Sequence, residues 1–370
     1  MSERLLTKLA DVLVAHSVQV SDGDVVLVHA PTAAAPLVRA LYRRVLAAGG
    51  LPEIRLDIDR REEVLLAEAS DAQLAWLDPA LIEATVRADC RIIVLAPRNT
   101  RGLSSSPVQR RGIRQRAGKP LLDLVERRTG EGTLRPVVTV YPTQALAQEA
   151  GMSLGDYEDF VAAASLLDAA NPVAAWDALG ERAGNLSSWL GTVSELRVVG
   201  SDTDLTMSVR GRTWVPACGR ENFPDGEVFT APHEASVEGT ITFDHPTLHN
   251  GQALEDVRLS FRSGEITEAT ARRGQGLLGE MLGLDDGASR VGEFAFGLNE
   301  AVQRFTGEPL FDEKIDGTVH LALGSAYQEC GGTNQSALHW DIVKDLRGGG
   351  EVYADGELVY RDGRFLGRPA

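Results

Sequence analysis

Cysteines and common catalytic motifs are scarce in this chain. Its 370 residues include three cysteines, an odd number without a CxxC pair, which argues against a disulfide framework and a thiolate zinc site. No GxxxxGKS/T or HExxH motif occurs, and no GxGxxG follows the first strand-like run, so the usual signatures of phosphate binding, of zinc-binding helices and of dinucleotide binding after a first strand are missing. The cysteine usage fits a reducing compartment, and we expect a cytoplasmic protein.

Positive charge and long apolar runs are also in short supply. Lys and Arg number 37 against 53 Asp and Glu, a net charge of −16, which disfavours nucleic acid as a partner. The basic stretch Arg98 to Lys119 is interpreted as a solvated surface segment. No apolar run approaches the roughly 18 residues that cross a bilayer, so we expect no membrane association. The amphipathic residues 1–18 lack a small-residue cleavage site and predict a helix rather than a signal peptide.

Strand and helix patterns alternate in the first half of the chain. Helical patterns such as 33–48 and 78–88 separate short apolar runs that are typical of buried strands. These runs occupy residues 24–30, 52–57, 90–96 and 136–141. The alternation predicts a mostly parallel sheet with helices on both faces, which we assign to an α/β N-terminal domain over residues 1–190.

Strand patterns dominate beyond residue 190. A hairpin is predicted over 257–261 and 265–269, and a helix over 276–284. Asp-Gly pairs at 355–356 and 362–363 are typical of tight turns between short strands. Further strand patterns occupy 195–199, 204–209 and 236–243. The second half is therefore predicted to be an α+β C-terminal domain over residues 191–370.

Two histidines lie in apolar, strand-like runs of the second half. His320 stands in GTVHLALG, and His339 stands in SALHWDIV, where Asp341 follows two residues later. Side chains two apart project from the same face of a strand, so His339 and Asp341 face the same way. Burying such groups without partners costs on the order of several kcal/mol, so each needs a hydrogen bond, an opposite charge or a metal ion. A bare His-x-Asp pair leaves a satisfied core histidine and a metal ligand both open.

Three glutamates also interrupt apolar or strand-like segments. Glu227 follows a Pro-Asp-Gly turn, Glu293 stands in RVGEFAFG, and Glu313 comes shortly before the His320 strand. Taken singly, each is more often an exposed carboxylate or one paired with Lys or Arg. Together with the two histidines and the aspartate above, they provide the oxygen and nitrogen donors that hold two divalent ions about 3.5–4 Å apart around a bridging water. The set indicates a two-metal hydrolytic site.

Several segments in this order closely resemble the thermophilic metallo-aminopeptidase family of the aminopeptidase T and aminopeptidase S type. They are NFPDGEVFTAP at 222–232 with SVEG at 236–239, GEFAFGLN at 292–299, GTVHLALGSAY at 317–327 and NQSALHWD at 334–341. The N-terminal half agrees more loosely, through VYPT at 140–143, AGMS at 150–153 and YEDF at 157–160. The resemblance covers most of the chain, with its weight in the C-terminal domain.

This resemblance implies an exopeptidase that removes N-terminal residues from peptides, with a broad, leucine-like preference, and that works as a homodimer. It implies two divalent metal ions per chain, Zn²⁺ or Co²⁺, with Mn²⁺ or Mg²⁺ as alternatives. Matched position by position, the family's metal ligands are Glu227, Glu293, Glu313, His320, His339 and Asp341.

Tyr327 matches a tyrosine that lies beside the metals in the family. We expect its hydroxyl to donate a hydrogen bond to the oxyanion that develops on the scissile carbonyl, and a packed core tyrosine is the other interpretation. The segment between Tyr327 and His339 is shorter than in longer members, so peptide length and side-chain preference do not follow from the resemblance. His233 and Glu234 lie close enough to Glu227 in sequence to support the ligands.

Two other functions remain open. Some ring-cleaving dioxygenases that act on dihydroxypyridines look similar in the His-x-Asp region, where His320, His339 and Asp341 would form the facial triad of a mononuclear non-haem iron site. Such a triad has no need for Glu227, Glu293 and Glu313, whereas a dinuclear site uses them, which favours the peptidase. A non-catalytic, metal-stabilised binding protein fits the same ligands.

Overall fold

The structure is a computed structural model that describes residues 1–249 and 252–367. The chain divides into two compact units, each of which is described by itself. The first contains residues 1–176 and 219–224, and the second contains the rest of the chain. Helix α9, Pro172–Leu190, contributes residues to both.

The first unit is built on a five-stranded sheet in the order β2-β1-β3-β4-β8. All four strand pairs are parallel. The short strand β8 comes from far along the chain, and its Phe223 ring packs 5.0 Å from the ring of Trp176. The strands are β1 (Val25–Pro31), β2 (Leu51–Asp57), β3 (Cys90–Leu95), β4 (Arg135–Val140) and β8 (Asn222–Phe223).

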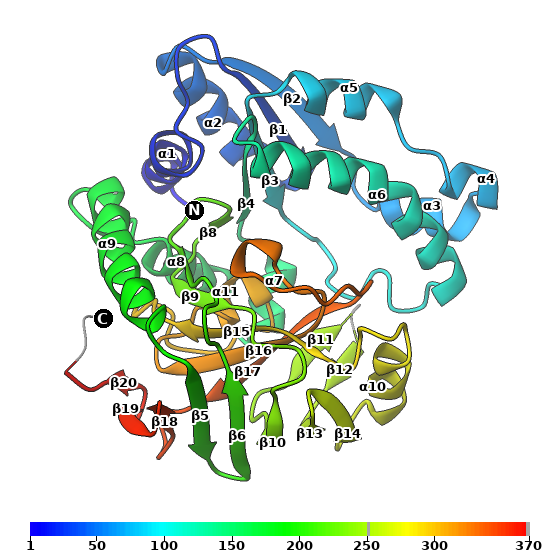
Figure 1. The fold of residues 1–370 in the computed structure, drawn as a ribbon. Helices are drawn as coiled ribbons and strands as arrows, with labels where there is room; N and C mark the ends of the chain where they lie inside the picture. The colour runs from blue at the N-terminus through cyan, green and yellow to red at the C-terminus, as the bar shows by residue number, and fades with distance from the viewer. Residues whose placement is uncertain (250–251, 368–370) are drawn as a thin grey trace. The chain divides into compact units, whose positions relative to one another are not determined.

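Helices cover both faces of this parallel sheet. Figure 1 shows α1 and α2 on one side and α5 and α6 on the other, where Leu27 of β1 packs in one cluster with Ala84 and Val125. The helical elements are α1 (Glu3–Val12), η1 (Leu13–Ser17), η2 (Thr32–Ala34), α2 (Ala35–Ala47), α3 (Arg61–Glu68), α4 (Asp71–Leu74), α5 (Pro79–Arg87), α6 (Val108–Gly130), α7 (Gln144–Glu149) and α8 (Leu154–Ala164). The predicted α/β class is confirmed. In the basic segment, Arg114 of α6 pairs with Glu62 of the same unit at 3.2 Å.

The second unit contains two large antiparallel sheets and a small hairpin. The larger sheet has the order β14-β13-β10-β6-β5-β18-β19-β20, the smaller one β17-β16-β15-β9-β7, and β11 pairs with β12. The strands of the larger sheet are β5 (Glu195–Gly200), β6 (Thr203–Ser208), β10 (Glu238–Thr242), β13 (Arg258–Arg262), β14 (Glu265–Thr270), β18 (Glu351–Ala354), β19 (Glu357–Arg361) and β20 (Arg364–Phe365). The other strands are β7 (Val215–Ala217), β9 (Glu227–Thr230), β11 (Thr247–His249), β12 (Gln252–Leu254), β15 (Val291–Gly297), β16 (Thr318–Gly324) and β17 (His339–Asp345).

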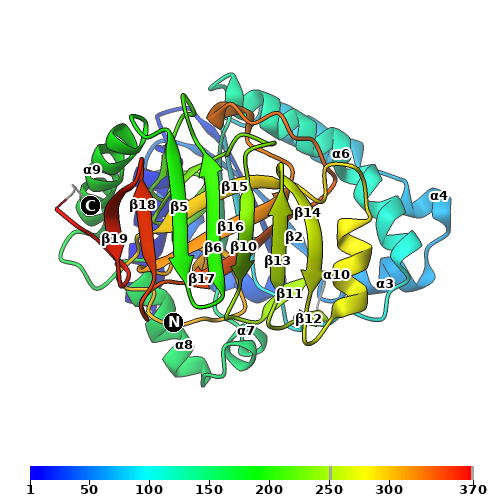
Figure 2. The same ribbon diagram turned by 60° about the horizontal axis from the view of Figure 1, so that its bottom comes forward.

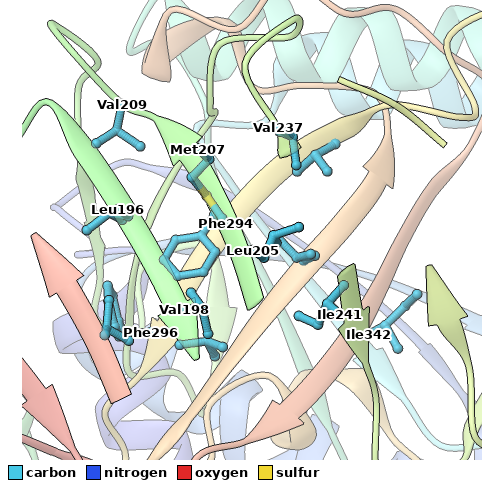
Figure 3. Packing of buried hydrophobic residues seen from close by; sticks show 14 of the residues in the cluster. Leu196, Val198, Leu205, Met207, Val209, Val237, Ile241, Phe294, Phe296 and Ile342 are labelled. Carbon is cyan, nitrogen blue, oxygen red and sulfur yellow. The ribbon is translucent and has the colours of Figure 1, made fainter. Parts of the chain in front are cut away.

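The core of the second unit lies between the two large sheets. Figure 2 shows the larger sheet in front of β15, β16 and β17, and Figure 3 shows Leu196 and Met207 of the larger sheet beside Phe294 and Phe296 of β15. Short helices complete the unit: α10 (Gln275–Leu282), α11 (Pro309–Asp312) and η3 (Gln328–Cys330). The predicted α+β class is confirmed, and both predicted Asp-Gly turns have φ near +50° at the aspartate, as tight hairpin turns require. Within the described chain, no helix has both the length and the apolar character needed to span a membrane.

Candidate metal centre

Five of the six predicted ligand residues lie on one face of the smaller sheet. They come from four neighbouring strands: Glu227 on β9, Glu293 on β15, His320 on β16, and His339 and Asp341 on β17. The register explains the placement, because Ala322 lies opposite both Glu293 and Asp341, and His320 is two residues away on the same face. The intervening residues point the other way, into the apolar core.

A bulge aims Glu293 at this cluster. The pairing of β15 with β16 shifts register between Val291 and Glu293, so Gly292 is the extra residue. A Cβ atom on Gly292 would lie 2.3 Å from the carbonyl oxygen of Ser325, a distance at which the backbone would have to move. Glycine at this position therefore lets the strand bend closely past Ser325 and still present Glu293 on the polar face.

Glu293 belongs to two groups of potential ligand atoms. In the first, His320 Nε2 lies 3.3 Å from Glu227 Oε2 and 3.5 Å from Glu293 Oε1. In the second, His339 Nε2 lies 3.3 Å from Glu293 Oε2 and 3.5 Å from Asp341 Oδ2. Within each group, one ligand atom per residue lies within 4.8 Å of the others. Glu293 therefore stands between two candidate cation positions, one oxygen toward each.

A hydrogen bond to the backbone fixes the orientation of the His339 ring. Its Nδ1 lies 3.0 Å from the Ser325 carbonyl oxygen, which can only accept, so Nδ1 donates and Nε2 faces the carboxylates. Backbone carbonyls commonly hold metal-binding histidines in this way.

Several buried polar atoms of the centre lack hydrogen-bond partners among the described residues. They are Glu227 Oε2, Asp341 Oδ1 and His320 Nδ1. Buried carboxylate oxygens without donors are costly, and a divalent cation would satisfy those of Glu227 and Asp341. The donor set of carboxylates and imidazoles also suits borderline divalent ions. The residues present therefore fit the metal centre that the sequence predicts.

The charges of the centre depend strongly on one another. Burial raises the pKa of Glu227 to about 8, against the opposing charges of Lys314 and His320. Burial acts in the same direction on Glu293, but hydrogen bonds from His320 and His339 bring the pKa of Glu293 down to about 2. Although burial disfavours charged imidazoles, the carboxylates raise the pKa of His320 to about 9 and that of His339 to about 10. Cations that bind here must therefore displace protons from both histidines.

Glu313 lies beside the centre but in neither ligand group. Its Oε2 accepts a hydrogen bond of 3.0 Å from Lys314 Nζ, which also donates to Glu227 Oε1 at 2.5 Å. Glu313 also lines a cavity of about 20 Å³ next to Asp341, which is room for a water molecule. Sequence reasoning missed Lys314, although a lysine between apolar Leu310-Phe311 and the buried β16 strand is the signal that could have found it.

Tyr327 lies beside His339. The two rings are 5.2 Å apart in an edge-to-face arrangement, and the Phe229 ring is 5.0 Å away on another side. Desolvation of the hydroxyl, followed by the negative charges of Glu293 and Asp341, raises the pKa of Tyr327 well above its usual range. The hydroxyl therefore stays protonated and remains a hydrogen-bond donor.

Glu234 holds the loop between Tyr327 and His339, a role that differs from the expected support of Glu227. Its Oε1 accepts hydrogen bonds from the backbone N–H and the hydroxyl of Thr333, at 2.6 and 2.7 Å, and its Oε2 accepts from Arg212. Partial burial would raise the pKa of Glu234, but these donors bring it down to about 2. His233 instead lies with Nε2 2.9 Å from the Arg210 carbonyl oxygen.

Comparison with known proteins extends over nearly the whole chain. Aminopeptidase T of Thermus thermophilus is 28% identical over 398 aligned residues, which cover 98% of this chain and 96% of that protein. The solved structure of wild-type AmpT from Thermus thermophilus superposes with a TM-score of 0.87 at 25% identity, over 98% of this chain and 99% of that one. A 2,5-dihydroxypyridine dioxygenase from Pseudomonas putida KT2440 superposes with a TM-score of 0.60 at 15% identity, over 99% of this chain and 98% of that one, and thus shares the fold.

The sequence profile of one family matches residues 2–365. This match confirms the resemblance found in the segments of both halves. The chain belongs to the thermophilic metalloprotease family M29.

Proposed function

We propose that this protein is a metallo-aminopeptidase that removes N-terminal residues from peptides with a dinuclear metal centre. The observation that carries the proposal is the placement of Glu293 between two groups of ligand atoms, Glu227 with His320 and His339 with Asp341. A shared carboxylate between two cation positions is the arrangement that a two-metal hydrolase uses. The names of the family's similar members, such as aminopeptidase T, support the exopeptidase reaction.

Different residues of the chain orient the ligands and stabilise the developing oxyanion. Divalent ions, when bound, supply a water of lowered pKa and polarise the scissile carbonyl. Ser325 orients His339 through its carbonyl oxygen. Tyr327, kept protonated, donates a hydrogen bond to the oxyanion that develops on the scissile carbonyl. No serine or cysteine nucleophile is required.

The finer properties come from the family resemblance. We propose Zn²⁺ or Co²⁺ as the ions, with Mn²⁺ or Mg²⁺ as alternatives, a broad leucine-like preference, a cytoplasmic location and a homodimer. Sedimentation of the purified protein tests the dimer, since a monomer at micromolar concentration would contradict it.

One experiment tests the reaction and the metal count together. The purified chain is stripped with chelator, reloaded separately with each of the four ions, and assayed on leucyl, alanyl and N-acetyl-leucyl chromogenic amides. We expect release from the amides with a free amine, little release from the acetylated one, and close to two ions per chain by elemental analysis. Absence of release with every ion would overturn the aminopeptidase proposal.

The count of metal ions per chain also tests the mononuclear iron alternative. A facial triad of His320, His339 and Asp341 would bind a single Fe²⁺ and would leave Glu227 and Glu293 buried without a ligand role. A stoichiometry of one iron per chain with oxygen uptake on a dihydroxypyridine would favour the dioxygenase. A tightly bound metal without turnover of either substrate would favour a binding protein.

A further inference from the structure

Lys314 is a buried cation beside the centre that the proposed reaction does not use. Its side chain is 1% exposed, and its Nζ lies 2.5 Å from Glu227 Oε1, 3.0 Å from Glu313 Oε2 and 3.9 Å from Asp225 Oδ1. All three carboxylate groups are themselves largely buried. The ammonium thus lies among three carboxylates that would otherwise repel one another.

The backbone holds Lys314 in place independently of its side chain. The lysine lies in the turn between α11 and β16, and its carbonyl oxygen accepts a 2.9 Å hydrogen bond from the Asn299 N–H. The turn fits closely because Gly297 has no Cβ, an atom that would come within 2.2 Å of the Ile315 carbonyl oxygen. Just upstream, the Asp312 carboxylate accepts hydrogen bonds from Thr306 and Gly307. The ammonium is therefore a fixed charge rather than a mobile surface group.

A fixed cation has opposite effects in the two states of the centre. In the metal-free chain it lies between carboxylates whose mutual repulsion in a buried site would otherwise oppose folding. In the metal-loaded chain the divalent ions neutralise the same carboxylates, and the ammonium then repels those ions. Lys314 donates to Oε1 of Glu227, and the other carboxylate oxygen, Oε2, lies toward His320.

We propose that Lys314 is a tethered cation that holds the carboxylates of the metal-free centre together until metal ions bind. It is a positioning residue for Glu227 and Glu313. The inference rests on the proposed metal centre but not on the reaction, so it is tested by melting temperature rather than by activity.

The first test compares Lys314→Met with Lys344→Met in chelator and in a saturating divalent ion. Lys344 is the matched control, because it is also buried, pairs with Asp244 at 2.8 Å, and points from β17 toward the opposite face. The ion is whichever of Zn²⁺, Co²⁺, Mn²⁺ and Mg²⁺ raises the wild-type melting temperature most. In chelator we expect Lys314→Met to melt roughly 10 °C below wild type, because buried acids lose their counter-charge. With the ion this gap should shrink by at least about half, whereas the Lys344→Met gap should be equal in both conditions.

A second variant distinguishes charge compensation from packing. In the wild-type background, Glu313→Gln should lower the melting temperature in chelator, because Lys314 loses one of its negatively charged partners. In the Lys314→Met background, the same change should raise it, because one uncompensated negative charge is removed. If Lys314→Met folds only with metal, the double variant should restore folding in chelator.

Each outcome decides the proposal. An equal loss for Lys314→Met in both conditions, or a Glu313→Gln effect of the same sign in both backgrounds, would overturn it and leave the proposed function standing. A wild-type chain that no divalent ion stabilises would overturn both. A melting gap that closes with metal supports Lys314 even if no amide is hydrolysed.

Discussion

The smaller sheet of the second unit, β17-β16-β15-β9-β7, carries apolar side chains on one face and charged side chains on the other. On β15, Phe294 and Phe296 point into the apolar core and are fully buried, whereas Glu293 between the glycine bulge and Phe294 points to the polar face and is 3% exposed. On β16, Leu321 and Leu323 flank the core in the same way and His320 faces the carboxylates. The core face is packed with carbon atoms, whereas the polar face pairs opposite charges and leaves the His339 side chain 31% exposed.

This contrast shows why the acidic and basic side chains are tolerated. A buried face of uncompensated carboxylates would destabilise the unit, but the rigid apolar face behind it holds the strands in register. The core behind the polar face thereby positions its carboxylates and imidazoles. The Gly292 bulge changes the local strand path and presents Glu293 on the polar face.

Removing the shared carboxylate should have the largest effect. Glu293→Gln keeps the shape of the side chain but withdraws an anionic ligand from both groups, so we expect metal affinity to fall by more than roughly a hundredfold, beyond what supporting residues typically contribute, and peptide hydrolysis to be lost. Elemental analysis after gel filtration and the leucyl-amide assay measure both. Glu268→Gln, at an exposed position of β14, is the control. Retention of two ions by Glu293→Gln would show that the polar face is not a metal centre.

Replacing Phe294, the neighbour of Glu293 on the core face, should lower stability and leave metal binding unchanged. Phe294→Ala removes a fully buried ring from the core, and we expect the free energy of unfolding to fall by about 3–5 kcal/mol. The fraction that remains folded should still bind metal with unchanged stoichiometry. Denaturant unfolding followed by tryptophan fluorescence, together with elemental analysis of the folded peak, tests the separation. Loss of metal from well-folded Phe294→Ala would contradict the division of labour between the two faces.

A change in chemistry without a change in packing should come from Tyr327→Phe. The ring contacts with His339 and Phe229 are kept, and only the hydroxyl is lost. We expect kcat to fall by roughly 10²–10³-fold, as for other single oxyanion donors, with KM, metal content and melting temperature nearly unchanged. Equal kcat values for the variant and the wild type would show that Tyr327 contributes packing and not an oxyanion hydrogen bond.

Much of this arrangement could be predicted from local patterns. Period-two alternation in GTVHLALG and SALHWDIV places His320, His339 and Asp341 on strands, and the structure has both strands. Alternating strand and helix signals likewise predicted the parallel sheet of the first unit. These features depend on neighbours in sequence, which is why single-sequence reasoning reaches them.

Features that depend on distant pairing were not predicted. Nothing in the sequence indicates that residues 222–223 add a strand to β4, more than 80 positions earlier in the chain. The bulge at Gly292 and the contact of Lys314 with Glu227 depend on the register between strands, which local patterns do not specify. For the same reason Glu234 was expected to support Glu227, its neighbour in sequence, whereas it holds Thr333.

We expect the smallest change in stability from Glu234, which lies outside the ligand groups and holds the loop between Tyr327 and His339 through Thr333. The pKa of Glu234 is lowered to about 2 in the folded chain, against about 4.3 for an unfolded glutamate. A depressed folded pKa stabilises the protein above the unfolded value, and this contribution disappears as the pH falls from about 4.3 toward 2. Allowing for partial exposure, we expect Glu234→Gln to cost about 1 kcal/mol at neutral pH.

The pH profile separates this ion pair from a simple packing contact. The difference in unfolding free energy between wild type and Glu234→Gln should be constant from pH 7 to about pH 5 and should shrink toward pH 3, because the protonated wild-type carboxyl then resembles the amide. Denaturant melts at each pH measure it, with Glu238→Gln as a control that leaves Thr333 and Arg212 untouched. A difference that stays the same at every pH would mean that the loop is held by shape and hydrogen bonding alone, and that the charge of Glu234 does not contribute.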